Sequence, residues 1–399
     1  MIMNNIFYKN IILSFALIFV LFTLTNCTKP NTIRGYIEGL SNDTVFVMKA
    51  PLSNLAETVP IQDTIWAKDG RFAYTFPKDD AHILIFSFPQ FFTHDRPTGG
   101  VFTPDNSYIM IFTEPGEKIS FKGYLNSTGD LLGSVVVTGS ELNRDFSPIQ
   151  SKMFEINTNQ VEEEMAIEQA MVNNNREAQS AGFAKRMERL NVKRELFSNY
   201  INANIDNPLS AFILTRLPLD SIGLYYDKLG ESARNSVFRG MLDQQMEQYV
   251  NYTTTMKAMQ EVIVGSKAPD FTLESTDGKN VTLSTLRGKY VIIDFWGSWC
   301  PPCIAGIPKM KSFYEKYKSK LEIVGVACRE QSADVWQDAV KTYELPWINV
   351  YNDKLSDITP KYGIEGYPTK IVIDPEGTIV IRELGEVEDF YTKLESVIR

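Results

Sequence analysis

Histidine and cysteine are both scarce in this sequence. The 399 residues include two histidines, His82 and His94, and four cysteines. Neither histidine has a second metal-binding side chain at ligand spacing, so we expect no metal site, and no other cofactor is indicated. Four cysteines spread unevenly along the chain are also too few for the disulfide framework of a small secreted domain.

Positive charge is in the minority. There are 40 lysines and arginines against 49 aspartates and glutamates, which gives a formal net charge of −9. Such an acidic surface argues against nucleic acid as a partner. The apolar share of 44% indicates a globular protein, and 399 residues exceed what one hydrophobic core usually organises. We therefore expect two or three domains.

Long apolar runs are missing apart from one near the N-terminus. Lys9 precedes a run from Ile11 to Leu24, which is shorter than the ~20 residues of a membrane-spanning helix and suits the apolar part of a secretory signal. The run ends in Leu24-Thr25-Asn26-Cys27, which resembles the lipobox of bacterial lipoproteins. The resemblance implies that residues 1–26 are a signal peptide and that Cys27 carries a lipid anchor to the periplasmic face of a bacterial membrane. A plain cleaved signal and an uncleaved anchor are the alternatives.

Short strand signals separated by turns fill residues 27–140 and predict an all-β sandwich. Two hairpins are expected, one joining 64–66 to 72–76 and one joining 108–112 to 119–121. The strand rhythm and the segment Gly35-Tyr36-Ile37-Glu38-Gly39-Leu40 resemble a β-sandwich domain of unknown function found in envelope lipoproteins. Four aromatic residues are expected in its core or on an edge strand, with a ligand surface as the alternative: Phe86, Phe88, Phe91 and Phe92.

The strand signal disappears over residues 141–260, where the composition predicts several helices. The run Glu162-Glu163-Glu164 is expected to be a solvated helix face. Strand and helix signals then alternate over residues 261–399, which predicts an α/β layered domain. The chain is thus expected to be multidomain, with an N-terminal all-β sandwich, a central helical region and a C-terminal α/β domain.

One stretch of the last domain carries the chemistry. Residues 294–303 read DFWGSWCPPC and run from an apolar strand directly into a helix. The C-x-x-C spacing places Cys300 at the helix N-terminus, where unpaired backbone N–H groups and the helix dipole stabilise an attacking thiolate. Cys303 lies one turn inward, shielded but close enough to resolve a mixed disulfide on Cys300. A C-x-x-C can also be half of a zinc site, but the two further ligands are missing.

This segment resembles the thioredoxin motif, and residues 262–399 resemble the TlpA-like and ResA-like envelope reductases related to cytochrome c maturation. The segment Gly265–Phe271, the Asp277-Gly278 turn and the inserted region 336–362 all fit this family. The resemblance implies a thioredoxin fold over residues 261–399 and a redox-active disulfide between Cys300 and Cys303.

Three further positions match the family pattern. Asp294 corresponds to the buried acid that helps to deprotonate the resolving cysteine, and Pro308 corresponds to the proline that bends the active-site helix. Pro368 corresponds to the cis-proline beside the dithiol, which turns the backbone of Tyr367 toward an extended substrate strand. The residues expected to bind substrate are Trp299, Pro301, Tyr367 and Pro368.

Two departures from the family concern proton transfer. Gly306 stands where many of these reductases carry a glutamate, three residues after the second cysteine. The lysine that accompanies the buried acid has no clear counterpart, because the expected strand reads Ile323-Val324-Gly325-Val326. We therefore expect Asp294 to be the only acid near the dithiol and to act with water. Cys328, in the same strand, is expected to be an inert buried thiol, with a regulatory or resolving role as the alternative.

The sequence therefore predicts a dithiol–disulfide exchange enzyme that faces the periplasm and acts as a reductase. Its expected partners are protein dithiol or disulfide substrates and a membrane electron donor of the thiol-reductase type. A peroxiredoxin-like peroxidase is disfavoured because a lone peroxidatic cysteine in a Thr-x-x-Cys setting is missing. The alternative from another class is an envelope ligand-binding lipoprotein whose thioredoxin domain docks or senses redox state.

Overall fold

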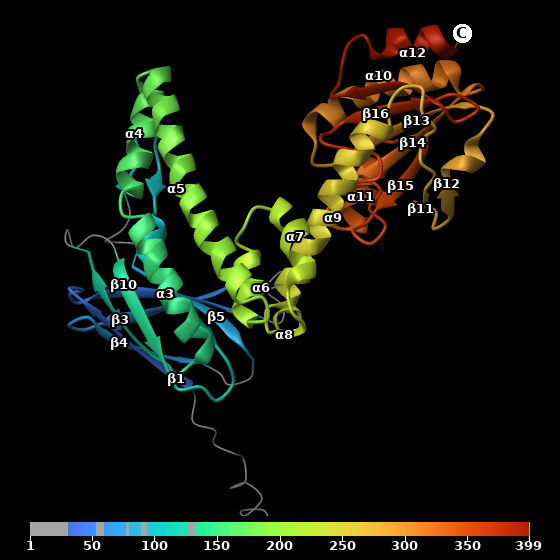
Figure 1. The fold of residues 1–399 in the computed structure, drawn as a ribbon. Helices are drawn as coiled ribbons and strands as arrows, with labels where there is room; N and C mark the ends of the chain where they lie inside the picture. Colours follow the sequence, from blue (N-terminus) through green and yellow to red (C-terminus); the bar gives the residue numbers. More distant parts are fainter. Residues whose placement is uncertain (1–30, 53–59, 77–79, 89–93, 127–131, 399) are drawn as a thin grey trace, which may run out of the picture. The chain divides into compact units, whose positions relative to one another are not determined.

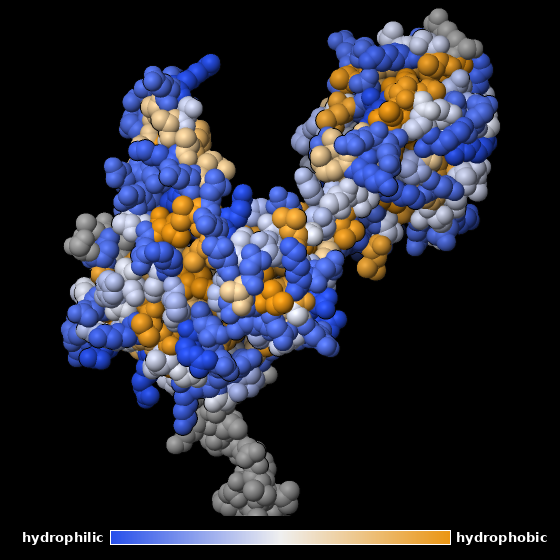
Figure 2. Space-filling view, viewed as in Figure 1, coloured by the Kyte–Doolittle hydropathy of each residue, from blue (hydrophilic) through white to orange (hydrophobic). Residues whose placement is uncertain are grey.

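The computed structural model describes residues 31–52, 60–76, 80–88, 94–126 and 132–398. The chain folds into two compact units, of which the first ends at Gln245 and the second begins at Met246 (Figure 1). The predicted signal peptide and Cys27 lie outside the described residues, as do Phe91 and Phe92. Within the described ranges, no helix is both long enough and apolar enough to cross a membrane. The face shown in Figure 2 is largely hydrophilic, in line with the 22% of charged residues.

Two four-stranded sheets form the first part of the N-terminal unit (Figure 1). Their strands are β1 (Asn31–Glu38), β2 (Asp43–Pro51), β3 (Ile61–Ala67), β4 (Arg71–Phe76), β5 (His82–Ser87), β8 (Tyr108–Thr113), β9 (Ser120–Leu125) and β10 (Leu132–Thr138). One sheet has the order β10-β9-β1-β4 and the other β3-β2-β5-β8. Every second residue of β1 is buried, and the inward faces of both sheets share one core. Phe86 and Phe88 belong to this core, as expected.

In neither predicted hairpin do the two strands pair with each other, although Lys68 and Arg71 pair across the first turn. The turn after β3 does form, with Asp69 and Gly70 at φ values of 48° and 71°. However, β3 pairs with β2, whereas β4 pairs with β1 in the other sheet, and β8 and β9 are divided in the same way. Turn residues determine where the chain reverses, but strand partners depend on the packing of distant segments. The two turns therefore carry the chain from one sheet to the other.

Helix α3 (Glu141–Ile156) covers one edge of each sheet. Asn143 and Gln150 hydrogen-bond to the backbone of β8, which is an edge strand of its sheet. Ser147 and Ser151, on the same helix, hydrogen-bond to the backbone of β10, an edge strand of the other sheet. Exposed strand edges invite pairing with other chains. The polar side chains of α3 thus satisfy and protect two edges at once.

Further helices follow α3, in agreement with the predicted central helices. They are α4 (Gln160–Val172), α5 (Arg176–Ala203), α6 (Pro208–Leu214), α7 (Asp220–Tyr225), α8 (Glu231–Arg234) and α9 (Arg239–Glu261). The expectation of a solvated glutamate run is wrong for Glu163 and Glu164, which both form ion pairs with Arg189 of α5, at 2.8 and 3.1 Å. The Arg189 side chain is only 6% exposed, and a buried cation requires such partners.

A seven-stranded sheet organises the C-terminal unit, in the order β12-β11-β15-β14-β13-β16-β17 (Figure 1). The strands are β11 (Thr272–Ser275), β12 (Asn280–Thr282), β13 (Tyr290–Trp296), β14 (Leu321–Cys328), β15 (Ile348–Asn352), β16 (Thr369–Ile373) and β17 (Ile379–Leu384). Strands β13, β14 and β15 are parallel neighbours. Strand β16 runs antiparallel to β13, and β17 runs antiparallel to β16.

Helices and loops cover both faces of this sheet. Helices α10 (Pro301–Tyr317) and α12 (Phe390–Ile398) contribute to the core on one face, and α11 (Ala333–Thr342) packs with Trp296 and the dithiol. Residues from the end of α9 and from the segment before β16 belong to the core on the other face. Strand β13 is therefore buried from its second residue to its last. The predicted fold class, with N-terminal sheets, central helices and a C-terminal thioredoxin fold, is confirmed.

Candidate active site

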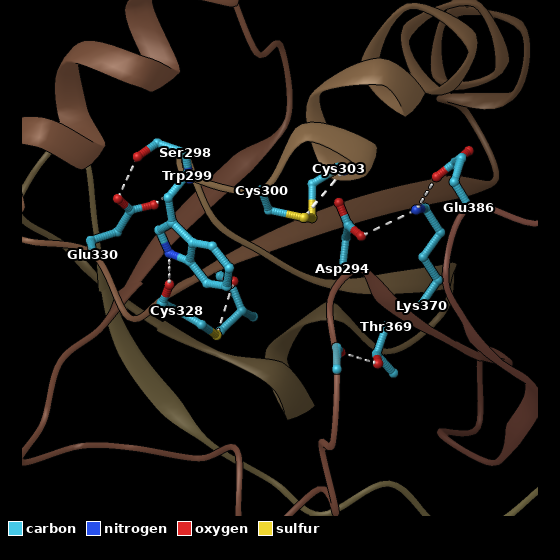
Figure 3. The surroundings of a disulfide bond; sticks show 12 residues. Asp294, Ser298, Trp299, Cys300, Cys303, Cys328, Glu330, Thr369, Lys370 and Glu386 are labelled. Carbon is cyan, nitrogen blue, oxygen red and sulfur yellow. Dashed lines mark hydrogen bonds and ion pairs between the residues drawn. A yellow bond between two sulfur atoms is a disulfide. The ribbon is translucent and has the colours of Figure 1, made fainter. Parts of the chain in front are cut away.

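The two cysteines of the motif lie where β13 ends and α10 begins. Cys300 is the N-cap residue of α10, and its Sγ accepts a hydrogen bond from the backbone N of Cys303 at 3.3 Å. A disulfide joins the two sulfur atoms, and the Cα atoms are 5.3 Å apart (Figure 3). Pro301 and Pro302 fill the first helical positions, where a missing N–H removes no intrahelical hydrogen bond. Cys300 and Cys303 are both buried, at 3% and 5% exposure, so exposure does not distinguish the attacking cysteine from the resolving one. The predicted roles rest on the positions of the two cysteines in the helix.

Asp294 on β13 lies directly opposite Lys370 on β16. The two residues are register partners in an antiparallel pair, so their side chains project from the same face of the sheet. Lys370 Nζ lies 3.6 Å from Asp294 Oδ1 and 2.6 Å from Glu386 Oε2. In Figure 3, Asp294 lies between the disulfide and Lys370, and Glu386 is on the far side of the lysine. Three ionisable side chains thus form a row that leads away from the dithiol: Asp294, Lys370 and Glu386.

Burial is the largest single influence on the pKa values of Asp294 and Lys370. Asp294 is 5% exposed and Lys370 is 2% exposed. Loss of solvent raises the pKa of Asp294 above its usual value, the Lys370 charge opposes this rise in part, and the Glu386 charge adds to it. Burial by itself would lower the pKa of Lys370, but the carboxylates of Asp294 and Glu386 outweigh it and raise that pKa. Lys370 therefore stays charged, while Asp294 has an increased affinity for a proton.

Two expectations about proton transfer are wrong. The lysine beside the buried acid exists, but it comes from β16 rather than from the strand of Ile323–Val326. Asp294 is also not the only acid in this neighbourhood, because Glu386 shares the lysine. Both contacts depend on the pairing of segments far apart in the sequence. One signal was present: Lys370 is the only charged residue of a strand that is buried throughout, and lysine is almost never fully buried without a partner.

An aromatic surface flanks the dithiol. The peptide bond between Tyr367 and Pro368 is cis, as expected. The Tyr367 ring meets Trp299 edge-on, with the ring centroids 5.4 Å apart, and the Arg329 guanidinium lies 5.5 Å from the centroid of the tyrosine. Trp299 is 47% exposed, and its Nε1 donates a hydrogen bond to the carbonyl of Cys328 at 3.0 Å. The role of these residues in binding substrate stays a prediction.

The loop after β14 holds the segment that precedes Cys300. The Glu330 carboxylate accepts hydrogen bonds from the backbone N and the Oγ of Ser298, each at 2.6 Å. Arg329, next to it, has a φ of 55°, which is uncommon for a residue other than glycine. Neither Glu330 nor Arg329 was identified from the sequence, since the contact joins residues 32 positions apart.

Cys328 is a free and fully buried thiol in β14. Burial raises its pKa well above the usual value for cysteine, and a thiol that keeps its proton is a poor nucleophile. This environment favours the inert role that the sequence suggested. Across the described part of the chain, no group of three or more His, Cys, Asp or Glu side chains is placed to hold a metal ion.

Known proteins resemble the C-terminal unit. Residues 264–382 match the AhpC/TSA family. The thiol-disulfide oxidoreductase ResA of Bacillus thuringiensis subsp. konkukian is 35% identical over 139 residues, which cover 35% of this chain and 78% of the relative. ResA of Bacillus subtilis is 36% identical over 133 residues, which cover 33% and 73%. Among solved structures, the thioredoxin domain of a thiol-disulfide oxidoreductase from Bacteroides vulgatus is 32% identical and covers 34% of this chain and 99% of that one, with a TM-score of 0.33.

The fold and the family match define the C-terminal unit as a thioredoxin-like domain of the AhpC/TSA kind. Because it covers 78% of a ResA relative at 35% identity, the chain belongs to the ResA-like thiol-disulfide oxidoreductases. The predicted family and the predicted enzyme class are confirmed.

Proposed function

We propose that this protein reduces disulfides in other proteins through Cys300 and Cys303 in the bacterial envelope. The observation that carries the proposal is the cysteine pair at the N-terminus of α10, with the buried carboxyl group of Asp294 beside it. The helix N-terminus favours a thiolate on Cys300. The raised pKa of Asp294 suits it to accept the proton of the second thiol.

The reaction takes two steps from the reduced dithiol. The Cys300 thiolate attacks one sulfur of a substrate disulfide, which forms a mixed disulfide and releases the first substrate thiolate. Asp294 then takes the proton of Cys303, and the new thiolate attacks Cys300 Sγ and releases the second substrate thiolate. The substrate gains two electrons, and the enzyme is left with the disulfide seen in the structure. A membrane dithiol donor of the thiol-reductase type restores the enzyme by the reverse exchange.

The surface around the dithiol supports an extended polypeptide as substrate. Trp299 presents a half-exposed indole, and the Tyr367 ring packs against it. Pro301 is exposed at the start of α10. A substrate strand that pairs with the backbone of Tyr367, next to Pro368, would bring its disulfide to Cys300.

The envelope location rests on the N-terminal sequence. The apolar run before Leu24-Thr25-Asn26-Cys27 suits an export signal, and lipid on Cys27 would hold the protein at the periplasmic face of a membrane. Disulfides persist in such oxidising compartments, so a reductase there has substrates and needs an electron donor in the membrane.

Trapping of intermediates tests the proposal. Cys303→Ser should accumulate mixed disulfides between Cys300 and envelope proteins, because the resolving thiol is gone. Cys300→Ser should accumulate few, because the remaining thiol lies one turn inside the helix. Non-reducing electrophoresis and mass spectrometry of the trapped species measure both. Equal trapping by the two variants would overturn the order of attack, and trapping by neither would overturn the exchange itself.

A further inference from the structure

Gly306 leaves a space in α10 that another segment fills. A Cβ atom built on this glycine would lie 2.5 Å from Glu386 Oε2 and 2.6 Å from its carboxyl carbon. Contacts this short do not occur between a real Cβ and its neighbours, so any side chain at position 306 must displace the Glu386 carboxylate. Glycine inside a helix costs roughly 1 kcal/mol relative to alanine. The Glu386 carboxylate occupies the place where a side chain at position 306 would begin.

The Glu386 carboxylate competes with Asp294 for one ammonium group. Lys370 Nζ lies 2.6 Å from Glu386 and 3.6 Å from Asp294, so the lysine is bound more closely to the outer acid. The side chains of Asp294 and Lys370 are 7% and 2% exposed, whereas that of Glu386 is 24% exposed. Asp294 Oδ1 has no hydrogen-bond partner. Asp294 is therefore only weakly paired with Lys370, which is the only cation among these three side chains.

This arrangement increases the proton affinity of the inner carboxyl in two ways. Glu386 holds Lys370 away from Asp294, and its own negative charge disfavours a second negative charge nearby. Lys370 alone would stabilise an ionised Asp294, and both effects of Glu386 oppose this stabilisation. Like burial, they raise the pKa of Asp294.

We propose that Glu386 is a positioning residue for disulfide exchange: it binds Lys370 in the space left by Gly306 and so keeps Asp294 a strong enough base for Cys303. The inference rests on the proposed function of the dithiol. In the step that it serves, the proton of Cys303 passes to Asp294, the Cys303–Cys300 bond forms, and the substrate sulfur leaves with the electron pair. Asp294 returns the proton to that thiolate or to water.

Other ionisable groups face this network and have to be considered in a pH experiment. Tyr391 on α12 and Cys328 on β14 both have a pKa raised mainly by burial, so each remains neutral through neutral pH. Lys309 on α10 lies over the Tyr391 ring, 4.8 Å from its centroid. The thiols of Cys300 and Cys303 also ionise in the reduced enzyme and affect the rate of the first attack. The resolving step therefore has to be measured separately.

The test compares Glu386→Gln with Glu395→Gln. Glu395 on α12 is a matched control, because its side chain is 27% exposed and it pairs with a different lysine, Lys316, at 2.7 Å. In stopped-flow measurements of the resolving step from pH 5 to 9, Glu386→Gln should move the midpoint of the rate profile to lower pH. The plateau rate should fall by up to about tenfold, a part of the ~10² to 10⁴-fold that a general base contributes. Glu395→Gln should behave as the wild type.

Gly306→Ala supplies a second and independent variant. Its methyl group should push the Glu386 carboxylate off Lys370 and reproduce the shifted profile of Glu386→Gln. Added to Glu386→Ala, the same substitution should have no further effect, because the space is then free. Wild-type pH profiles in both Glu386→Gln and Gly306→Ala, with full turnover, would overturn this inference and leave the proposed function standing. Failure of the wild type to reduce any disulfide would instead overturn the proposed function.

Discussion

A carboxyl group buried beside a dithiol has opposite effects on folding and on catalysis. In the unfolded chain Asp294 has a pKa near the usual value of about 3.9, and in the folded protein burial raises its pKa. The folded state therefore holds the proton to higher pH than the unfolded state does. Stability contributed by the protonated form is lost as the pH rises through the folded pKa. The same raised pKa makes the group a better proton acceptor for a thiol at neutral pH.

Asp294→Asn should separate the two effects, because asparagine resembles the protonated acid. The variant should resolve mixed disulfides ~10² to 10⁴-fold more slowly than the wild type, with a nearly unchanged first attack by Cys300. In urea unfolding, it should be more stable than the wild type at pH 8, and the difference should shrink toward pH 4. Asp338→Asn, on the exposed surface of α11, is the control. An unchanged resolving rate across pH 5 to 9 would remove Asp294 from the mechanism.

At the scale of elements, helix α3 provides the backbone partners that two sheet edges lack. Asn143 is 1% exposed; its Oδ1 accepts from the backbone N of Phe112 at 2.9 Å, and its Nδ2 donates to the carbonyl of the same residue at 2.6 Å. Asn143→Ala should leave both groups buried without partners, at about 1–3 kcal/mol for each. Amide hydrogen exchange in β8 should therefore accelerate. The neighbouring exposed Arg144→Ala should leave it unchanged; equal protection of β8 in both variants would contradict this role of α3.

The elements also show what sequence reasoning can reach. The dithiol follows from the C-x-x-C spacing at the start of a helix. Asp294 and the cis-proline follow from the family resemblance. The hairpins after β3 and β8 were wrong because turn residues say nothing about partners. Lys370 and Glu386 were missed for the same reason: their contacts depend on β16 lying beside β13. Residue pattern predicts elements well, whereas long-range pairing sets the electrostatics of the site.

At the scale of the whole molecule, anchoring would place the dithiol in the compartment where its substrates occur. Cys27→Ser should remove the lipid while leaving export intact, so the variant should move from the membrane fraction to the soluble periplasmic fraction. Metabolic labelling with a fatty acid and fractionation measure this, with Cys328→Ser as a control cysteine. A wild type without lipid label, or a Cys27→Ser variant that stays in the membrane fraction, would contradict the lipoprotein prediction.

The most direct test of the central claim is a count of electrons passed to a disulfide. The full-length protein, first reduced and freed of reductant, is mixed with a peptide that contains one disulfide, and the thiols of both partners are determined by alkylation and mass spectrometry. The account predicts that each protein molecule reduces one peptide disulfide and gains one disulfide, between Cys300 and Cys303, and that Cys300→Ser reduces none. A wild type that leaves the peptide oxidised, or a Cys300→Ser variant that reduces it equally well, would contradict the account.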